Sequence, residues 1–221
     1  MPDDLIFSKP WDRLVQFETL KADAVFSWKA TGGEHGKYKV RLFLQPPEKL
    51  KIQWLTPWGS VAGQVLIAEQ QFWLSDVSRK ETWHGMATDI EKLLQERGER
   101  FQIVATQFLK FWPLLFSSPE NDAKNSSSGL FIEYFSAGTG ENLSLTKTVL
   151  SLAGDEMHLK LSELEKLSDE RLMPLAVEVL SRGGEIGIKL RKYSLPQVLP
   201  AGTFVYNLKN FQYRPVRSLH Q

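Results

Sequence analysis

Residues Leu50–Ile67, LKIQWLTPWGSVAGQVLI, decide the fold class of this chain. Apolar and polar residues alternate over Leu50–Trp54, and Val61, Gly63, Val65 and Ile67 continue the pattern, which predicts two neighbouring strands of a sheet. Between them, Leu55–Ser60 contains a Pro-Trp-Gly turn. A turn normally carries a polar residue at its tip, because loops face water. The tryptophan at position 58 therefore needs a reason that the turn itself does not supply.

The same alternation recurs along most of the chain and predicts a long antiparallel meander. Gly183-Gly184, between two alternating segments, indicates a hairpin. Besides the two strands above, the expected strands are about Val25–Thr31, Tyr38–Leu44, Phe72–Leu74, Arg79–Trp83, Leu130–Tyr134, Leu143–Leu152, Met157–Leu161, Leu175–Leu180, Ile186–Tyr193, Phe204–Leu208 and Phe211–Tyr213.

Three segments have helical rather than alternating patterns. Residues 10–24 place apolar side chains at helical spacing, and Pro10 suits a first helical position. Thr88–Glu96 is amphipathic, and Gln102–Phe116 is apolar nearly all round, with a kink or an end expected at Pro113. The last of these is either a lid over an apolar cavity or a buried core helix.

These elements predict one domain, 1–221, of mainly β (α+β) class. A sheet of this length must curl, close or be covered to protect its edges. We expect a curled antiparallel sheet that forms an incomplete β-barrel, with an N-terminal helix and a central helical lid, about 86–118, over an apolar cavity.

Composition removes several classes of function. The 42% apolar content supports a real core, and 27 basic against 26 acidic residues give no charge excess for binding nucleic acid. The chain has no cysteine, hence no disulfide and no thiolate metal site. The acidic start Met1–Asp4 has no signal-peptide pattern, so either the protein is cytosolic or an export segment has been removed.

No catalytic constellation stands out. The four histidines, His35, His84, His158 and His220, form no metal-ligand spacing, and no nucleophile motif or phosphate-binding glycine loop occurs. We expect no enzyme activity, no metal and no cofactor. The remaining signals are apolar and aromatic. Trp58 is either folded back onto its own sheet or an anchor at a membrane surface, where tryptophan is favoured.

The order and spacing of several stretches resemble the outer-membrane lipoprotein receptor and carrier family, LolB and LolA. The resemblance covers most of the chain. The stretches that carry it are Val25–Ala30, Tyr38–Leu44, Leu55–Ser60, Phe108–Leu115 and Leu175–Leu190, the last with the hairpin Gly183–Leu190.

This resemblance implies binding of lipid or lipoprotein acyl chains for transport to the outer membrane. It gives Trp58 the membrane-inserting position of the LolB turn. Partners would be acyl chains, the outer-membrane surface and a periplasmic carrier, with the protein a monomer at the periplasmic face, lipid-anchored in its precursor. The missing N-terminal cysteine and the run Leu199–Phe204 depart from LolB and leave the subfamily open.

Two other functions compete with acyl-chain binding. The same fold could bind a protein partner in the envelope, or house a lipid hydrolase, for which we find no nucleophile and base. The residues expected to line the cavity or lid are Trp54, Ile90, Leu94, Phe108, Leu109, Phe111, Trp112 and Leu115.

Overall fold

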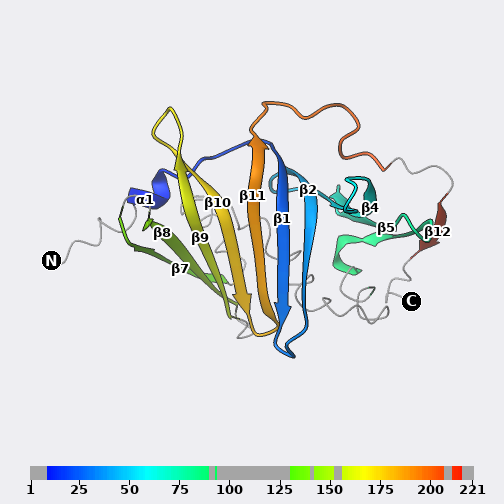
Figure 1. Ribbon diagram of the computed structural model, residues 1–221, viewed down its shortest axis with the longest axis horizontal. Coiled ribbons are helices and arrows are strands. Elements are labelled where there is room, and N and C mark those ends of the chain that lie inside the picture. Colours follow the sequence, from blue (N-terminus) through cyan, green and yellow to red (C-terminus); the bar gives the residue numbers. More distant parts are fainter. Residues whose placement is uncertain are drawn as a thin grey trace. The chain divides into compact units, whose positions relative to one another are not determined.

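The computed structural model describes residues 9–89, 93, 130–139, 142–151, 156–206 and 211–215 (Figure 1). Strands dominate these residues. In chain order the elements are α1 (Lys9–Asp12), β1 (Leu20–Ala30), β2 (His35–Gln45), β3 (Lys49–Leu55), β4 (Val61–Ala68), β5 (Gln71–Asp76), β6 (Glu81–Met86), the 3₁₀ turn η1 (Ala87–Asp89), β7 (Leu130–Ala137), β8 (Ser144–Ser151), β9 (Glu156–Lys166), β10 (Leu172–Ser181), β11 (Gly184–Ser194) and β12 (Gln212–Pro215).

The strands form one sheet in the order β12-β6-β5-β4-β3-β2-β1-β11-β10-β9-β8-β7. The hairpins from β2 to β6 and the strands from β7 to β11 pair antiparallel, whereas β12 runs parallel to β6. The order has two ends, β12 and β7, so the sheet is not closed into a barrel. The expected mainly β, antiparallel architecture is confirmed.

Contacts divide the chain into two compact units. Unit 1 contains Met1–Gln16, Ser27–Gly36 and Ile103–Lys189, and unit 2 contains Phe17–Phe26, Lys37–Gln102 and Leu190–Gln221. Strands β1, β2 and β11 each contribute residues to both units. The division therefore does not decide the prediction of a single domain.

In unit 2, one face of strands β2–β5 is a continuous apolar core. Residues directly opposite one another in an antiparallel pair share a face, and Leu42, Ile52 and Val65 are opposite one another across β2, β3 and β4. Burial of each such side chain contributes about 1.5 to 3 kcal/mol. We call this the apolar face; its buried members are Val40, Leu42, Leu44, Leu50, Ile52, Val65, Ile67 and Phe72.

Unit 1 has a core of the same kind on strands β8–β11. The buried residues alternate along β8, β9 and β11, as a half-buried sheet requires, whereas β10 is also buried at neighbouring positions. They are Leu145, Val149, Met157, Leu159, Leu161, Val177, Val179, Ile186 and Ile188.

The expected helix over residues 10–24 is wrong beyond its first turn. Helix α1 ends at Asp12, and the Val15 amide donates to the Leu172 carbonyl (2.9 Å), which joins this segment to β10. From Leu20 onward the burial alternates with period two, so residues 20–24 belong to β1. The apolar spacing in this stretch fits both periods, and pairing with the sheet decides between them.

The expected central lid falls mainly on residues outside those described. Residues Ala87–Asp89 form η1, and Leu93 is helical and buried. The helix expected at Gln102–Phe116 falls wholly outside the described residues. Among the helices that the structure describes, none has the length and apolar character needed to cross a membrane.

Candidate site at the β3–β4 turn and the sheet faces of unit 2

The β3–β4 turn is closed by its own hydrogen bonds. The Gly59 amide donates to the Thr56 carbonyl (2.9 Å), the Thr56 amide donates to the Ser60 carbonyl (2.8 Å), and the two hydroxyls are 2.8 Å apart. Pro57 suits the second position of such a turn, and Gly59 has a φ of 85°, which favours glycine. These hydrogen bonds and backbone angles place Trp58 at the tip of the turn.

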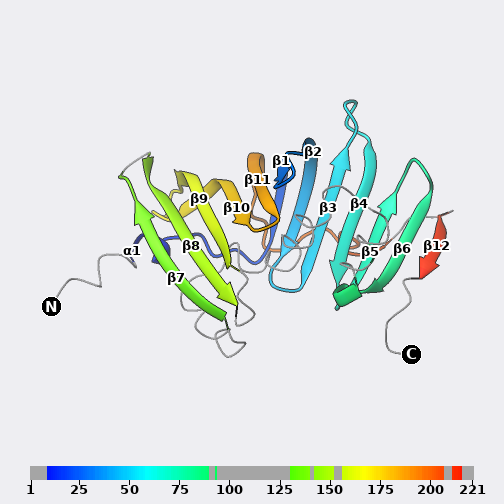
Figure 2. The same cartoon turned by 90° about the horizontal axis from the view of Figure 1, so that it is seen from below.

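Trp58 is the most exposed large apolar side chain in the described part of the chain, with 91% of its surface accessible. The alternative that its ring folds back onto its own sheet does not agree with this exposure. Figure 2 shows the β3–β4 turn, in cyan, reaching beyond the β5–β6 turn of the same unit. Its part in membrane insertion stays a prediction.

Trp54, expected in the cavity, lies on the apolar face opposite Gly63. It is half-buried, and its indole covers the glycine so closely that a Cβ on Gly63 would lie 2.4 Å from the indole Nε1. Trp54 therefore extends the apolar face toward the Trp58 turn. The other expected cavity and lid residues lie outside the described residues: Ile90, Leu94, Phe108, Leu109, Phe111, Trp112 and Leu115.

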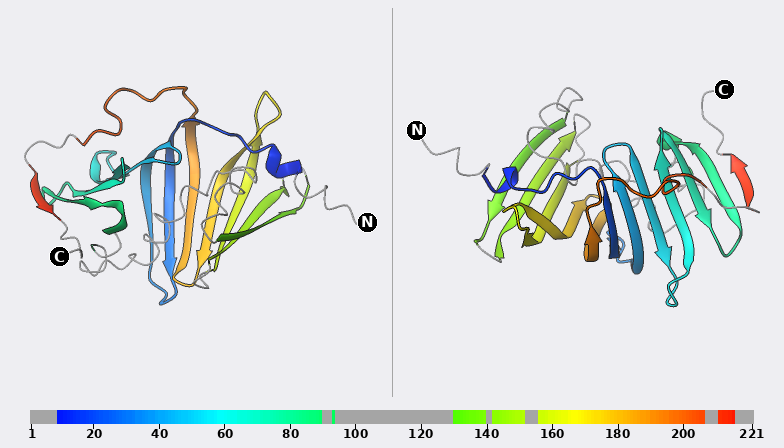
Figure 3. Two further views of the ribbon diagram at one scale, coloured as in Figure 1. Left: turned by 180° about the vertical axis from the view of Figure 1, so that it is seen from behind. Right: turned by 90° about the horizontal axis from the view of Figure 1, so that it is seen from above.

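The opposite face of unit 2 is crossed by an irregular segment that the sequence did not reveal. We call residues 195–206 the strap. Figure 3, in its right-hand view, shows it in orange running across β2, β3 and β4. The expected strand beginning at Phe204 is wrong for the described residues, because Thr203 and Val205 donate their amides to Pro200 and Gly202 in successive turns. Its prolines could have indicated this irregular course.

Polar contacts hold the strap. Lys51 Nζ donates to the Thr203 carbonyl (2.9 Å), and the Thr19 hydroxyl donates to the Pro196 carbonyl. Burial lowers the pKa of Lys51. The Tyr206 ring is stacked on Trp73, with centroids 6.1 Å apart, and its hydroxyl lies 2.6 Å from that of Thr82.

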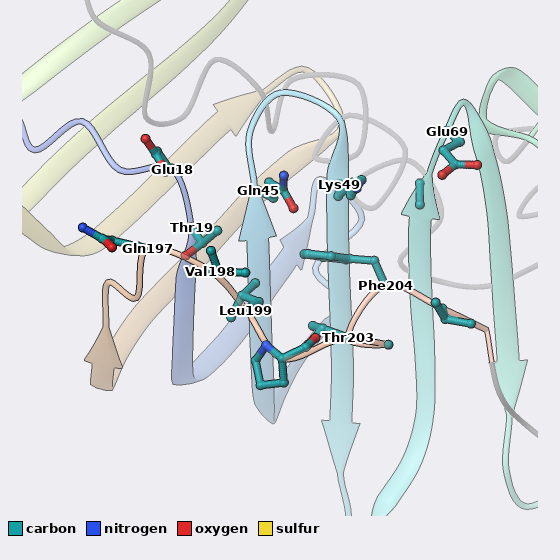
Figure 4. A pocket seen from close by; sticks show the side chains of 14 residues that line it. Glu18, Thr19, Gln45, Lys49, Glu69, Gln197, Val198, Leu199, Thr203 and Phe204 are labelled. Carbon is teal, nitrogen blue, oxygen red and sulfur yellow. The ribbon is translucent and has the colours of Figure 1, made fainter.

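Under the strap lies a groove of about 440 Å³ (Figure 4). Its walls include Glu18, Gln45, Lys49, Glu69 and Gln197. This lining is polar in large part, and Lys49 and Gln45 face away from the apolar face. The groove is therefore not the apolar cavity expected from the sequence.

A buried lysine in unit 1 was also missed. Lys147 on β8 is fully buried, with its Nζ 5.7 Å from the Trp11 ring and 5.4 Å from the Tyr134 ring. Trp11 meets Tyr134 edge to face and donates its indole N–H to the Phe135 carbonyl (3.1 Å). Aromatic faces stabilise such a cation by about 0.5 to 2 kcal/mol. The sequence feature that could have indicated this burial is the position of Lys147, which stands among the inward-facing residues of a strand whose side chains alternate.

Comparison with solved structures identifies the fold. A LolA superfamily protein from Nitrosomonas europaea is similar with a TM-score of 0.51 and 9% identity, over 93% of this chain and 98% of its own. A domain named for outer membrane lipoprotein sorting, from Vibrio parahaemolyticus, has a TM-score of 0.52 and 9% identity over 89% and 93%. A DUF1329 family protein from Desulfovibrio piger has a TM-score of 0.50 and 10% identity over 90% and 94%.

Together with the strand order, these similar structures assign the chain to a class of proteins built on one open antiparallel sheet. No family model and no curated protein matches by sequence. The chain has the LolA/LolB-like fold, and the resemblance seen in its sequence is confirmed at that level.

Proposed function

We propose that this protein binds lipid acyl chains without catalysis and passes them to a membrane in the cell envelope, where Trp58 inserts. The observation that carries the proposal is the exposure of Trp58 at the tip of a hydrogen-bonded turn. The apolar face beside it, the LolA/LolB-like fold and the sorting function in the name of one similar structure support it.

Such a carrier must bury the acyl chain reversibly. Each CH₂ removed from water contributes about 0.8 kcal/mol, so complete burial of several long chains would bind too tightly for release. A carrier therefore needs partial burial. Burial of about half of a tryptophan's roughly 200 Å² in a membrane interface contributes about 2 to 3 kcal/mol, enough to hold a transient contact.

Acyl-chain binding is tested with delipidated protein and a fluorescent fatty-acid probe. We expect a saturable rise in probe fluorescence that unlabelled fatty acid reverses. Absence of saturable binding in correctly folded protein would overturn acyl-chain binding.

Membrane delivery is tested with Trp58→Glu. A carboxylate at the turn tip should lower transfer of the bound probe to liposomes by roughly tenfold to a hundredfold, with probe binding and melting temperature unchanged. Val198→Glu is the matched control, because Val198 is an exposed apolar residue of the strap and the charge change is the same. Equal transfer by the wild type and Trp58→Glu would exclude insertion by Trp58.

A second candidate function rests on the edge strand β7 of unit 1. Phe131 and Phe135 on this strand are 63% and 50% exposed, which is unusual for two phenylalanines on one strand face. This observation favours binding of a protein partner. A pull-down from envelope extract, in which Phe131→Glu/Phe135→Glu loses a partner but keeps the fatty-acid probe, would support it over the lipid function.

A further inference from the structure

Basic residues gather around the Trp58 turn within unit 2. Strand β2 begins with His35-Gly36-Lys37-Tyr38-Lys39, and its two lysines are exposed. The β5–β6 turn carries Arg79 and Lys80, both exposed. All four cations come from segments that neighbour the β3–β4 hairpin in the sheet.

The register brings these segments to the same end of the strands. Val40 is opposite Trp54, so the residues that precede Val40 run alongside the last residues of β3 toward its turn. Gly63 is opposite Asp76, and the Val77 amide donates to the Ala62 carbonyl (3.0 Å). The β5–β6 turn therefore lies beside the first residues of β4, next to the Trp58 turn.

The acidic residues at this end are Glu34, Asp76 and Glu81, and the one whose ion pair the structure gives, Asp76, pairs with an arginine. Burial alone would raise the pKa of Asp76, but hydrogen bonds from Ser78 and the Arg79 amide, with the Arg79 charge, lower it below its usual value. The ionised carboxylate pairs with Arg79 (3.6 Å). Lys37, Lys39 and Lys80 make no ion pair within the part of the chain that the structure describes.

We propose that this end of unit 2 recognises anionic phospholipid headgroups, with Lys37, Lys39 and Lys80 binding phosphates around the inserted Trp58 ring. The inference rests on the proposed function, because it names the membrane surface on which the Trp58 turn acts. Lysine stems lie along apolar surface while the ammonium groups stay at the headgroups, which suits lysines on the segments that flank an apolar tip.

The test compares vesicles of phosphatidylcholine with vesicles that also contain about one third phosphatidylglycerol, by co-sedimentation at low and high salt. Each lysine near an anionic surface contributes about fivefold in affinity, so Lys37→Gln/Lys39→Gln/Lys80→Gln should lose on the order of a hundredfold on the anionic vesicles at low salt. Salt at about 0.5 M should remove the anionic preference of the wild type, because it screens the lysine charges.

A matched control removes the same charge elsewhere in unit 2. Lys21, Arg191 and Lys192 are exposed at the opposite end of their strands, and Lys21→Gln/Arg191→Gln/Lys192→Gln should bind anionic vesicles like the wild type. Replacement of the three turn-end lysines by arginine should also keep the affinity, since the charge remains.

The outcomes separate this inference from the proposed function. Equal binding of the wild type to neutral and anionic vesicles, or equal loss in both glutamine triples, overturns headgroup recognition while fatty-acid probe binding upholds the carrier. Loss of probe binding with a retained, lysine-dependent anionic preference overturns acyl-chain binding and supports surface recognition alone.

Discussion

At the scale of single residues, the contact between Trp54 and Gly63 is the tightest constraint near the Trp58 turn. A Cβ at position 63 would lie 2.4 to 2.6 Å from three atoms of the Trp54 indole. The ring must move to admit it, because such a distance is well inside van der Waals contact. We predict that Gly63→Ala lowers the free energy of unfolding by about 1 to 3 kcal/mol, measured by urea denaturation.

A second variant separates this steric cause from a backbone effect. In Trp54→Leu the indole is absent, so adding Gly63→Ala to it should cost less than about 1 kcal/mol. If the alanine is as costly without the indole as with it, the indole contact is not the cause.

Residue-level prediction succeeded where chemistry was local. The Pro-Trp-Gly turn follows from three neighbouring residues. The sequence left two alternatives for the Trp58 ring, and its exposure agrees with the anchor alternative. Lys147 shows the limit. Its aromatic contacts join α1, β7 and β8, and no local pattern reports that Trp11 packs against Tyr134.

At the scale of elements, Asp76 organises the β5–β6 turn. Its Oδ1 accepts hydrogen bonds from the Ser78 amide (2.9 Å), the Ser78 hydroxyl (2.6 Å) and the Arg79 amide (3.1 Å). We predict that Asp76→Ala lowers the free energy of unfolding at pH 7 by about 1 to 2 kcal/mol in urea denaturation.

The pH dependence of that loss has a definite sign. The pKa of Asp76 is lower in the folded state than in the unfolded state, so its contribution is complete above the unfolded pKa of about 4 and is lost as the pH falls through the folded value. The difference between wild type and Asp76→Ala should shrink below pH 4. Asp23→Ala, which removes only an exposed pair with Arg41, should cost less than about 1 kcal/mol.

Tyr206, the last residue of the strap, attaches it to the sheet through Trp73 and Thr82. Thr82 donates its one hydroxyl hydrogen to Ser75 (3.0 Å), so the Tyr206 hydroxyl is the donor to Thr82. We predict that Tyr206→Ala increases the rate of limited proteolysis within 195–206 several-fold, while Tyr206→Phe, which keeps the stack on Trp73, has a smaller effect. Unchanged cleavage in Tyr206→Ala would show that the strap is held elsewhere.

Elements were predictable where one period dominated. The strands expected at Tyr38–Leu44 and Leu50–Trp54 lie within β2 and β3, because their side chains alternate and turn residues separate them. The strand expected at Arg79–Trp83 begins two residues too early, since Arg79 and Lys80 belong to the β5–β6 turn. The segment 10–24 failed because its apolar residues satisfy both periods. Its backbone bonds to Leu172, far along the chain, decide the outcome.

At the scale of the whole molecule, the sequence predicted one antiparallel sheet but not its order. A meander places each strand beside the next in the chain, and β2 to β6 follow this rule. Local patterns do not report that β11 lies next to β1, or that β12 adds parallel to β6, because both pairings join distant segments. The order and spacing of the stretches that resemble LolA and LolB indicated the fold, and the solved structures confirm it.

The parallel addition of β12 also has a consequence for the time course of folding. The Thr82–Tyr206 contact beside it joins residues 124 positions apart, and the Thr19–Pro196 contact joins residues 177 apart. Loops of that length close slowly, and they cannot close before the later partner has been synthesised. The β6 edge therefore stays unpaired until residues 212–215 have been synthesised, and its backbone is open to pairing with other chains for that time.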